Sequence, residues 1–334
     1  MWNLRVLTLI LACVVAISGQ DFGYRGQDGP EHWGDEYKRC SGKYQSPINI
    51  DDLNVVKRDY PDLEYINFDS TPESVSVTNN GHTVLVKMSF AKGKEPRVRG
   101  GPLERQAYYQ FEQFHFHWGE NDTVGSEDTI NNKAYPAEMH LVVRNLDYPD
   151  FNSALGQDHG IAVLAYFFRI KNVGSASYAE FTRSLANISR KGQTIDLSNP
   201  LPLMSYVSKD PVNFYSYVGS LTTPPCAEEV VWVDFHEPID ISEDQLQHFR
   251  LLTANDDHLK NNFRPTQPLN NRTVYQQNPI EFDHSNSRWG KMPEYNPNKN
   301  NAATSVDGSL AALLGSAYSL LLLLFQESVT ELLN

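Results

Sequence analysis

The sequence predicts a mainly β protein in one large domain, with a few short helices at its periphery. From Glu64 onwards, short runs of β-branched and aromatic residues alternate with turn residues, which is the pattern of half-buried strands. Helical periodicity is confined to two short stretches, and no internal repeat or linker interrupts the chain before about residue 283. With 334 residues, 40% of them hydrophobic, the chain can bury a substantial core. We therefore place one domain at residues 20–282.

The domain is expected to begin with an irregular segment, residues 20–50, which is rich in Gly, Pro and aromatic residues. The clearest strand signal follows, because Ser74–Thr78 alternates, Asn79–His82 reads as a turn, and Thr83–Met88 alternates back. An Asn-Gly pair between β-branched runs is a strong hairpin signal. Further strands are expected at residues 107–118, 136–145, 160–171, 213–218 and 229–236.

Two helices are expected. Ser175–Ile188 places Tyr178, Phe181 and Leu185 at helical spacing, so that they share one face. Ser242 is followed three residues later by Gln245, which is the pattern of a capping box at the start of a short helix.

Both ends of the chain carry targeting signals. Residues 1–19 combine a short apolar run with small residues at its end, as a secretory signal peptide does. Residues 283–301 form a polar stalk, and residues 302–334 contain the second apolar run, Leu310–Phe325, as in a signal for a GPI anchor. Asn301, followed by two alanines, is the expected attachment site. A single-pass helix is the competing interpretation, but 16 residues are short for it.

Cysteine usage and sequons agree with export, and the net charge argues against one class of partner. The mature chain keeps Cys40 and Cys226, which in an oxidising compartment most simply form one disulfide, although two free thiols are the alternative. The sequons at Asn121, Asn187 and Asn271 are predicted glycosylation sites. The net charge of −13 argues against a nucleic-acid partner, which would require a basic surface.

Three histidines have the spacing of metal ligands. His115 and His117 are two residues apart in a predicted strand, so their side chains point to the same face. If strand 136–145 pairs antiparallel with strand 107–118, His140 lies beside them. Gln113 and Glu138 each precede a histidine by two residues and can accept a hydrogen bond from its second ring nitrogen. A buried structural pair of histidines is the alternative.

Three neutral histidines and one open position are typical of a catalytic zinc site. Because no carboxylate or thiolate ligand reduces its charge, the Zn²⁺ would lower the pKa of a bound water to about 7 and make hydroxide available at neutral pH. The sequence therefore predicts Zn²⁺ as the cofactor.

With these features the chain resembles an α-class carbonic anhydrase in its secreted, membrane-anchored form. The resemblance extends from about Tyr24 to Arg272, and the zinc-bound water with a pKa near 7 is itself a known property of this family. The resemblance implies a large, twisted, mostly antiparallel central sheet. The matching stretches are Gly29–Trp33, Gln45–Ile50, Asn80–His82, Gln113–Gly119, Gly125–Glu127, Ala137–Val142, Gly219–Pro225 and Phe263–Pro268.

The resemblance also assigns roles. His115, His117 and His140 match the zinc ligands, with Gln113 and Glu138 behind them. Thr222 matches the residue whose hydroxyl orients the zinc-bound hydroxide. Glu127 matches the carboxylate that accepts the hydrogen of the threonine hydroxyl. His82 matches the proton shuttle, and Tyr24 matches a tyrosine that orders the intervening waters; an ordinary turn histidine is the alternative for His82. Leu85 departs from the polar residue often found near this water path.

Other matches concern the substrate pocket and the disulfide. Cys40 and Cys226 match a disulfide that braces the loop bearing Thr222. For the pocket residues, plain core packing is the alternative. The residues that match the apolar wall, with the neighbouring threonine, are Val142, Val163, Leu221, Thr223 and Trp232.

The implied function is reversible hydration of carbon dioxide to bicarbonate and a proton by zinc-bound hydroxide, at the outer face of the plasma membrane. Such an enzyme would serve pH, carbon dioxide and bicarbonate homeostasis. Carbon dioxide and bicarbonate are the expected small-molecule partners, the membrane is contacted through a lipid anchor, and no protein partner is indicated. One alternative is a catalytically silent cell-surface binding module of the same fold. Another is a zinc hydrolase that acts on esters.

Overall fold

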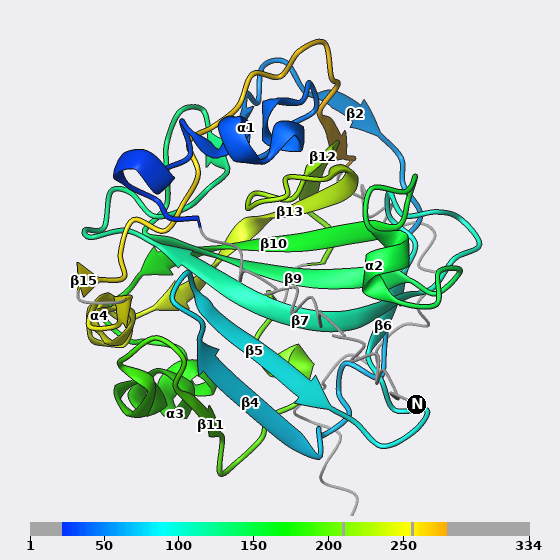
Figure 1. The fold of residues 1–334 in the computed structure, drawn as a ribbon. Helices are drawn as coiled ribbons and strands as arrows, with labels where there is room; N and C mark the ends of the chain where they lie inside the picture. Colours follow the sequence, from blue (N-terminus) through cyan, green and yellow to red (C-terminus); the bar gives the residue numbers. More distant parts are fainter. Residues whose placement is uncertain (1–21, 209–210, 255–256, 279–334) are drawn as a thin grey trace, which may run out of the picture. The chain divides into compact units, whose positions relative to one another are not determined.

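A twelve-stranded sheet forms the centre of the described molecule (Figure 1). This computed structural model describes residues 22–208, 211–254 and 257–278. The predicted signal peptide, stalk, anchor signal and attachment site at Asn301 lie outside these residues. The strands, in the order of the sheet, are β11 (Thr194–Asp196), β4 (Ser74–Asn79), β5 (Val84–Ser89), β7 (Tyr109–Trp118), β9 (Ala137–Asn145), β10 (Ile161–Ile170), β13 (Glu228–Ile241), β12 (Phe214–Ser220), β16 (Tyr275–Gln277) and β2 (Val56–Arg58), with β3 (Glu64–Ile66) paired to β6 (Arg97–Arg99) and β6 to β7.

The sheet is mostly antiparallel, as expected, but it is mixed. Within it, β10 pairs with β13 and β16 pairs with β2 in parallel, whereas the other printed pairs are antiparallel. Two small separate ladders join β1 (Asn49–Ile50) to β8 (Thr129–Ile130) and β14 (Thr253–Ala254) to β15 (Asp257–His258). The predicted mainly β fold with a large central sheet is confirmed.

The predicted hairpin is formed by β4 and β5. The Asn80 backbone N–H donates to the Thr83 carbonyl at 3.2 Å, and Gly81 has a φ of 90°, a conformation that glycine adopts readily. The tight Asn-Gly turn therefore fixes the register of the two strands, as the sequence indicated.

The helices are short and lie at the periphery of the sheet (Figure 1). The predicted helix 175–188 is observed as α3 (Ala176–Ser184), which continues into the 3₁₀ turn η3 (Leu185–Ile188). The predicted capping box is present, because the Ser242 hydroxyl accepts from the Gln245 N–H and the Gln245 side chain accepts from the Ser242 N–H. This capping box begins α4 (Glu243–Arg250). The remaining helices of the described residues are η1 (Gly26–Asp28), α1 (Trp33–Glu36), η2 (Lys38–Ser41), α2 (Phe151–Ala154) and η4 (Leu203–Ser205).

Strand β13 is longer than the predicted strand 229–236. Its ladder with β10 is interrupted after the pair Tyr166–Phe235 and resumes at the pair Phe168–Ile239. This bulge removes Pro238 from the ladder, where its missing N–H would leave a carbonyl unpaired. Because Pro238 interrupts the strand pattern in the sequence, the predicted strand ends at residue 236, short of the observed end at Ile241.

The two faces of the sheet carry different side chains. On β7, Phe114 and Phe116 belong to the larger hydrophobic core, whereas the histidines between and after them point to the opposite face. On β9, Met139 and Leu141 enter the same core, and His140 points away from it. The larger core therefore lies on one face and the histidines lie on the other.

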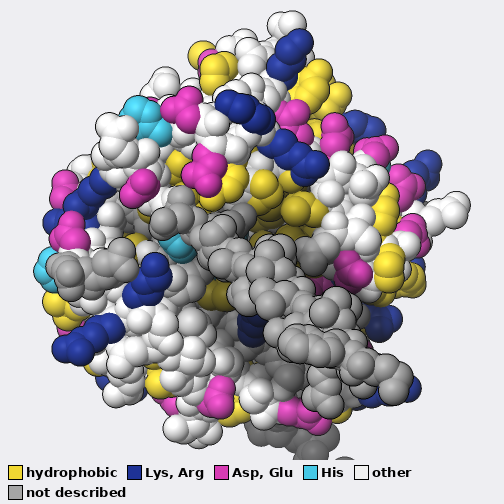
Figure 2. All heavy atoms as spheres, viewed as in Figure 1, with side chains coloured by type: hydrophobic (Ala, Val, Ile, Leu, Met, Phe, Trp, Pro, Cys, Tyr) yellow, Lys and Arg dark blue, Asp and Glu magenta, His cyan; other side chains and the backbone are white. Residues whose placement is uncertain are grey.

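Across the face shown in Figure 2, acidic and basic side chains of the described residues are interspersed. The described part of the chain contains no helix that is both long and apolar enough to cross a membrane.

Candidate metal centre

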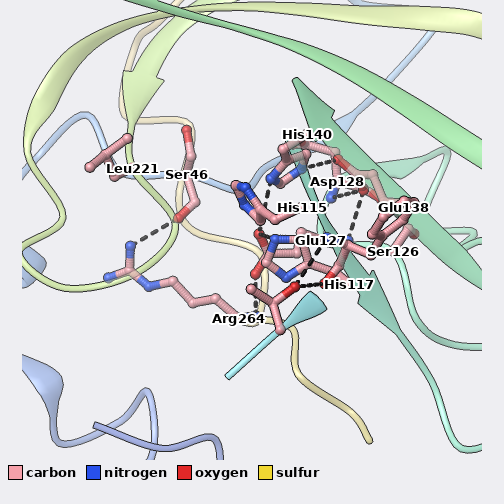
Figure 3. Close-up of polar contacts among 12 residues, drawn as sticks. Ser46, His115, His117, Ser126, Glu127, Asp128, Glu138, His140, Leu221 and Arg264 are labelled. Carbon is pink, nitrogen blue, oxygen red and sulfur yellow. Dashed lines mark hydrogen bonds and ion pairs between the residues drawn. The ribbon is translucent and has the colours of Figure 1, made fainter. Parts of the chain in front are cut away.

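The three candidate ligands come from two adjacent strands and converge on one point (Figure 3). His115 on β7 lies directly opposite His140 on β9, and His117 is the next residue on the same face of β7. One ring nitrogen from each histidine lies within 4.8 Å of those of the other two. The predicted antiparallel pairing of these strands is confirmed, and it brings the three imidazoles together.

Two of the histidines are held by the side chains that the sequence indicated. The Gln113 Oε1 lies 3.0 Å from Nδ1 of His115, and the Glu138 Oε1 lies 2.7 Å from Nε2 of His140. Each contact uses one ring nitrogen as the donor and so leaves the other with its lone pair free. The free atoms are Nε2 of His115 and Nδ1 of His140.

The third histidine has a partner that sequence reasoning missed. Nδ1 of His117 lies 2.7 Å from the backbone carbonyl of Asn262. Its Nε2 is buried and has no hydrogen-bond partner, although the Glu127 Oε2 lies 3.3 Å away. A buried imidazole nitrogen without a donor is costly in an apolar site, and a metal ion would satisfy it. The donor set of three imidazole nitrogens therefore fits Zn²⁺.

The electrostatic environment keeps these rings neutral. Burial lowers the pKa of His115 and His117 well below the ordinary value, and the neighbouring histidines lower it further. Burial lowers the pKa of His140 to about 3. Neutral imidazole is the form that binds metals, so no proton has to be removed at neutral pH.

Glu127 lies beside His115 and His117 and is 1% exposed (Figure 3). Its Oε1 accepts a hydrogen bond from the Arg264 backbone N–H at 2.7 Å. Burial raises the pKa of Glu127 well above its ordinary value, whereas the hydrogen bonds from Arg264 and from the Thr222 side chain act in the opposite direction. Thr222 is only 5% exposed. The predicted pairing of Thr222 with Glu127 is therefore geometrically available.

Arg264 is a second residue whose role the sequence did not reveal. Its guanidinium donates to Gln45 Oε1 at 2.8 Å and to the carbonyls of Ser46 and Cys40, both at 2.9 Å. Arg264 thus connects two parts of the protein: its side chain bonds the N-terminal segment, and its backbone N–H bonds Glu127 (Figure 3). The stretch Phe263–Pro268 matches the family, but its sequence does not indicate which groups the Arg264 side chain bonds.

Glu138 uses both of its carboxylate oxygens. Oε1 contacts His140, and Oε2 accepts the backbone N–H groups of Glu127 and Asp128 at 2.8 and 3.0 Å. Burial raises the pKa of Glu138 to about 8, while the two N–H donors lower it. This side chain therefore connects a ligand histidine to the segment that carries Glu127.

An apolar row stands beside the histidines. Val142 on β9, Val163 on β10 and Trp232 on β13 are consecutive cross-strand neighbours, and each is at most 2% exposed. The ring centroids of Trp232 and His140 are 4.8 Å apart. Leu221 packs against this row, and Thr223 is half-buried in the same loop. The predicted pocket residues are therefore grouped next to the metal centre, and most of them also belong to a hydrophobic cluster.

His82 lies at the end of the β4–β5 turn. Its backbone N–H donates to Asn80 Oδ1 at 2.8 Å, and its carbonyl accepts from the Asn262 side chain at 3.0 Å. The His82 ring stacks on Phe22, with centroids 4.1 Å apart and an interplanar angle of 13°. Phe22 was not among the predicted site residues, because nothing in its sequence surroundings points to His82.

Two neighbours of the expected proton path can also be placed. Burial and the nearby charge of Glu127 raise the pKa of Tyr24 well above its ordinary value, so its hydroxyl keeps its proton. Leu85 is half-buried and lies directly across the β5–β7 ladder from His115. The residue that departs from the family pattern therefore neighbours a candidate ligand.

The disulfide between Cys40 and Cys226 is present, which confirms that prediction. It joins residues separated by 186 positions, and the Cys226 N–H donates to the Thr223 carbonyl at 2.9 Å. Phe22 and Trp33 pack with the two cysteines in one small buried cluster. The crosslink therefore connects the N-terminal segment to the loop that carries Thr222.

The predicted glycosylation sites Asn121, Asn187 and Asn271 are all exposed. They are therefore accessible to modification.

The fold and the site together define a class of protein: a β-sheet enzyme scaffold with a three-histidine metal centre on one face of the sheet. The chain belongs to the eukaryotic-type carbonic anhydrase family, whose model matches residues 28–278. This is an enzyme family, and its reaction is the hydration of carbon dioxide.

Several named relatives show the same affiliation. Carbonic anhydrase 7 of Homo sapiens is 40% identical over 262 residues, which cover 76% of this chain and 96% of the relative. Putative carbonic anhydrase 3 of Caenorhabditis elegans is 36% identical over 248 residues, 74% and 92% of the two chains. Carbonic anhydrase 3 of Homo sapiens is 34% identical, with 76% and 97% covered.

Proposed function

We propose that this protein catalyses the zinc-dependent, reversible hydration of carbon dioxide to bicarbonate and a proton. The observation that carries the proposal is the arrangement of His115, His117 and His140. Each ring has one nitrogen held by a partner on the protein, and the remaining nitrogens converge. A purely structural cluster would not leave a buried, unpartnered Nε2 on His117.

When bound by these three neutral imidazoles, Zn²⁺ would lower the pKa of a coordinated water to about 7 and so supply hydroxide at neutral pH, which is a general property of the family. The rings are held before any metal arrives, by Gln113, Glu138 and the carbonyl of Asn262. Such support fixes the tautomer of each ligand and increases its basicity.

Thr222 and Glu127 would orient the attacking oxygen. Glu127 is buried and has a hydrogen bond with the Thr222 side chain, so the Thr222 hydroxyl hydrogen is directed to the carboxylate. The hydroxyl oxygen of Thr222 is then an acceptor, which selects one orientation of the nucleophile before the substrate arrives. The row Val142, Val163 and Trp232 would provide an apolar surface for carbon dioxide.

His82 would carry the product proton to buffer. A histidine side chain can accept and release a proton near neutral pH, and the backbone of His82 is fixed by the turn and by Asn262. Phe22 stacks on the ring and so favours one orientation of it. Turnover in weak buffer is therefore expected to depend on His82.

We also propose that the protein acts at the outer face of the plasma membrane, where it would serve pH and bicarbonate homeostasis. Support comes from the apolar run at each end of the sequence, the disulfide between Cys40 and Cys226, and three exposed sequons. Treatment of expressing cells with a phosphatidylinositol-specific phospholipase should release the protein. If the protein stays on the cells, the single-pass helix replaces the lipid anchor.

Stopped-flow hydration by the purified protein, with its zinc content measured, tests the reaction. We expect about one zinc per chain and rapid hydration. His140→Ala should lose zinc and activity together, whereas His258→Ala, which changes an exposed histidine, should lose neither. Stoichiometric zinc without hydration would favour the catalytically silent binding module of the same fold, and activity on esters alone would favour a hydrolase.

A further inference from the structure

A second group of buried ionisable side chains lies next to the metal centre. Carboxylate oxygens of Asp128, Glu138 and Asp234 lie within 4.8 Å of one another, and each residue is 0% exposed. The sheet explains how they meet. Asp234 on β13 is the cross-strand neighbour of Ala165 on β10, which in turn is the neighbour of His140 on β9. The small Ala165 side chain leaves space for a carboxylate to extend toward β9.

The three carboxylates differ in their partners. Asp128 Oδ1 accepts from the Ile48 N–H at 2.7 Å and from the Tyr217 hydroxyl at 3.1 Å. Glu138 is satisfied by His140 and by two backbone N–H groups. Asp234 has a hydrogen-bond partner on neither oxygen, although its side chain is wholly buried and reaches into the group.

Within the described residues, no lysine or arginine forms an ion pair with this group, although the more distant charge of Arg272 acts to lower the pKa of Asp128. Burial raises the pKa of Asp128 and Asp234 well above the ordinary value, and the neighbouring carboxylates raise it further. Burial of several carboxylates without a counter-charge is strongly unfavourable, so protons or a bound cation must compensate them.

We propose that Asp128, Glu138 and Asp234 form a second cation site, which takes a hard divalent cation such as Ca²⁺. Carboxylate oxygens are the preferred ligands of such ions. Opposite ligands in a calcium sphere lie about 4.6 to 5.2 Å apart, which accommodates the observed separation of the three oxygens. The two free oxygens of Asp234 can bind the ion as a bidentate pair, and a single divalent cation offsets charge that would otherwise require two protons.

This site is chemically distinct from the histidine centre, because it offers oxygen ligands and no nitrogen. One ion would connect Glu138 on β9, Asp234 on β13 and Asp128, which follows Glu127 in the chain. Since all three side chains are inaccessible to solvent, the ion is structural, enters during folding and exchanges slowly.

Metal analysis of the purified full chain tests the proposal. We expect about one zinc and about one additional divalent cation per chain. Asp234→Asn should lose the second cation and keep the zinc, because Asp234 contacts none of the histidines by a hydrogen bond or ion pair. Asp196→Asn, on the exposed edge strand β11, is the matched control and should keep both metals. Glu138 is left unchanged because it positions His140.

A second measurement covers the case in which Asp234→Asn folds poorly. Because the buried site is filled during folding, the native chain is unfolded with its disulfide intact, depleted of metal, and refolded with Zn²⁺ and Tb³⁺, a luminescent substitute for Ca²⁺, with and without excess Ca²⁺. Tyr217, whose hydroxyl bonds Asp128, should sensitise the emission, and Ca²⁺ should compete it away. Zinc as the only metal in the native protein, with no sensitised emission, would show that protons neutralise the group and would overturn the proposal. Retention of the second cation by Asp234→Asn would overturn it as well.

Discussion

Replacement of Asn262 by alanine should damage both the stability of the fold and the hold of the protein on its metal. Asn262 is 0% exposed, and its side chain makes three hydrogen bonds. Oδ1 accepts from the Trp118 N–H at 2.8 Å, and Nδ2 donates to the carbonyls of His82 and Phe116, both at 3.0 Å. Its own carbonyl holds His117. One side chain therefore joins the His82 turn to the strand that carries two of the candidate ligands.

The magnitude follows from those three bonds. Asn262→Ala removes three hydrogen bonds, each worth about 1 to 1.5 kcal/mol, so the free energy of unfolding should fall by about 3 to 4.5 kcal/mol; the value lies toward the lower end because the Phe116 carbonyl keeps the Thr83 hydroxyl as a donor. The backbone at residue 262 also loses its anchorage, so His117 is held less firmly. Loss of such support typically weakens metal binding by about 10- to 100-fold.

Urea unfolding of the zinc-loaded and zinc-free proteins measures the first effect, and the rate of zinc transfer to a chromogenic chelator measures the second. Asn152→Ala is the matched control, because Asn152 is exposed in α2 and should change either quantity little. A loss of less than about 1 kcal/mol would refute the assigned value of the hydrogen bonds. Reduced stability with an unchanged rate of zinc release would refute the link between Asn262 and His117.

Three further predictions can be tested with the same preparations. Replacement of both Cys40 and Cys226 by serine should lower the free energy of unfolding by about 3 to 5 kcal/mol, since the crosslink closes a loop of 186 residues, and the native protein in reductant should behave alike. His82→Ala should slow hydration in weak buffer and recover with added imidazole, with zinc content unchanged; equal rates in weak buffer would contradict the shuttle role. The third prediction concerns Glu138 in the protein freed of all bound metal. The pKa of Glu138 is about 8 in the folded state and 4.5 ordinarily, so between these pH values the folded protein binds a proton that the unfolded chain has lost. The free energy of unfolding therefore falls as the pH rises from about 4.5 to about 8. Glu138→Gln should therefore gain stability relative to the native protein between pH 5 and 8, by at most ~1.4 kcal/mol per pH unit in urea unfolding, and a constant difference would show that Glu138 does not titrate there.

Local patterns in the sequence were sufficient for the strands and for the ligand set. The period of two along a strand places His115 and His117 on one face and Gln113 at the correct position behind the first of them, and the structure has all three there. The Asn-Gly turn likewise fixed the β4–β5 hairpin. Strands of two or three residues, such as β1 and β16, were not predicted because they are too short to display a period.

The sequence by itself determined the mainly β fold, the three convergent histidines and two of their three supports, because side-chain direction along a strand is a local and periodic property. Tertiary structure alone decided the remainder. Asn262 reaches His117 from a loop 145 positions away, and Phe22 reaches His82. Asp234 meets Asp128 and Glu138 because the small Ala165 occupies the position between β13 and β9 on the intervening strand β10. Such contacts depend on how distant segments pack, and packing leaves no period in the sequence from which they could be predicted.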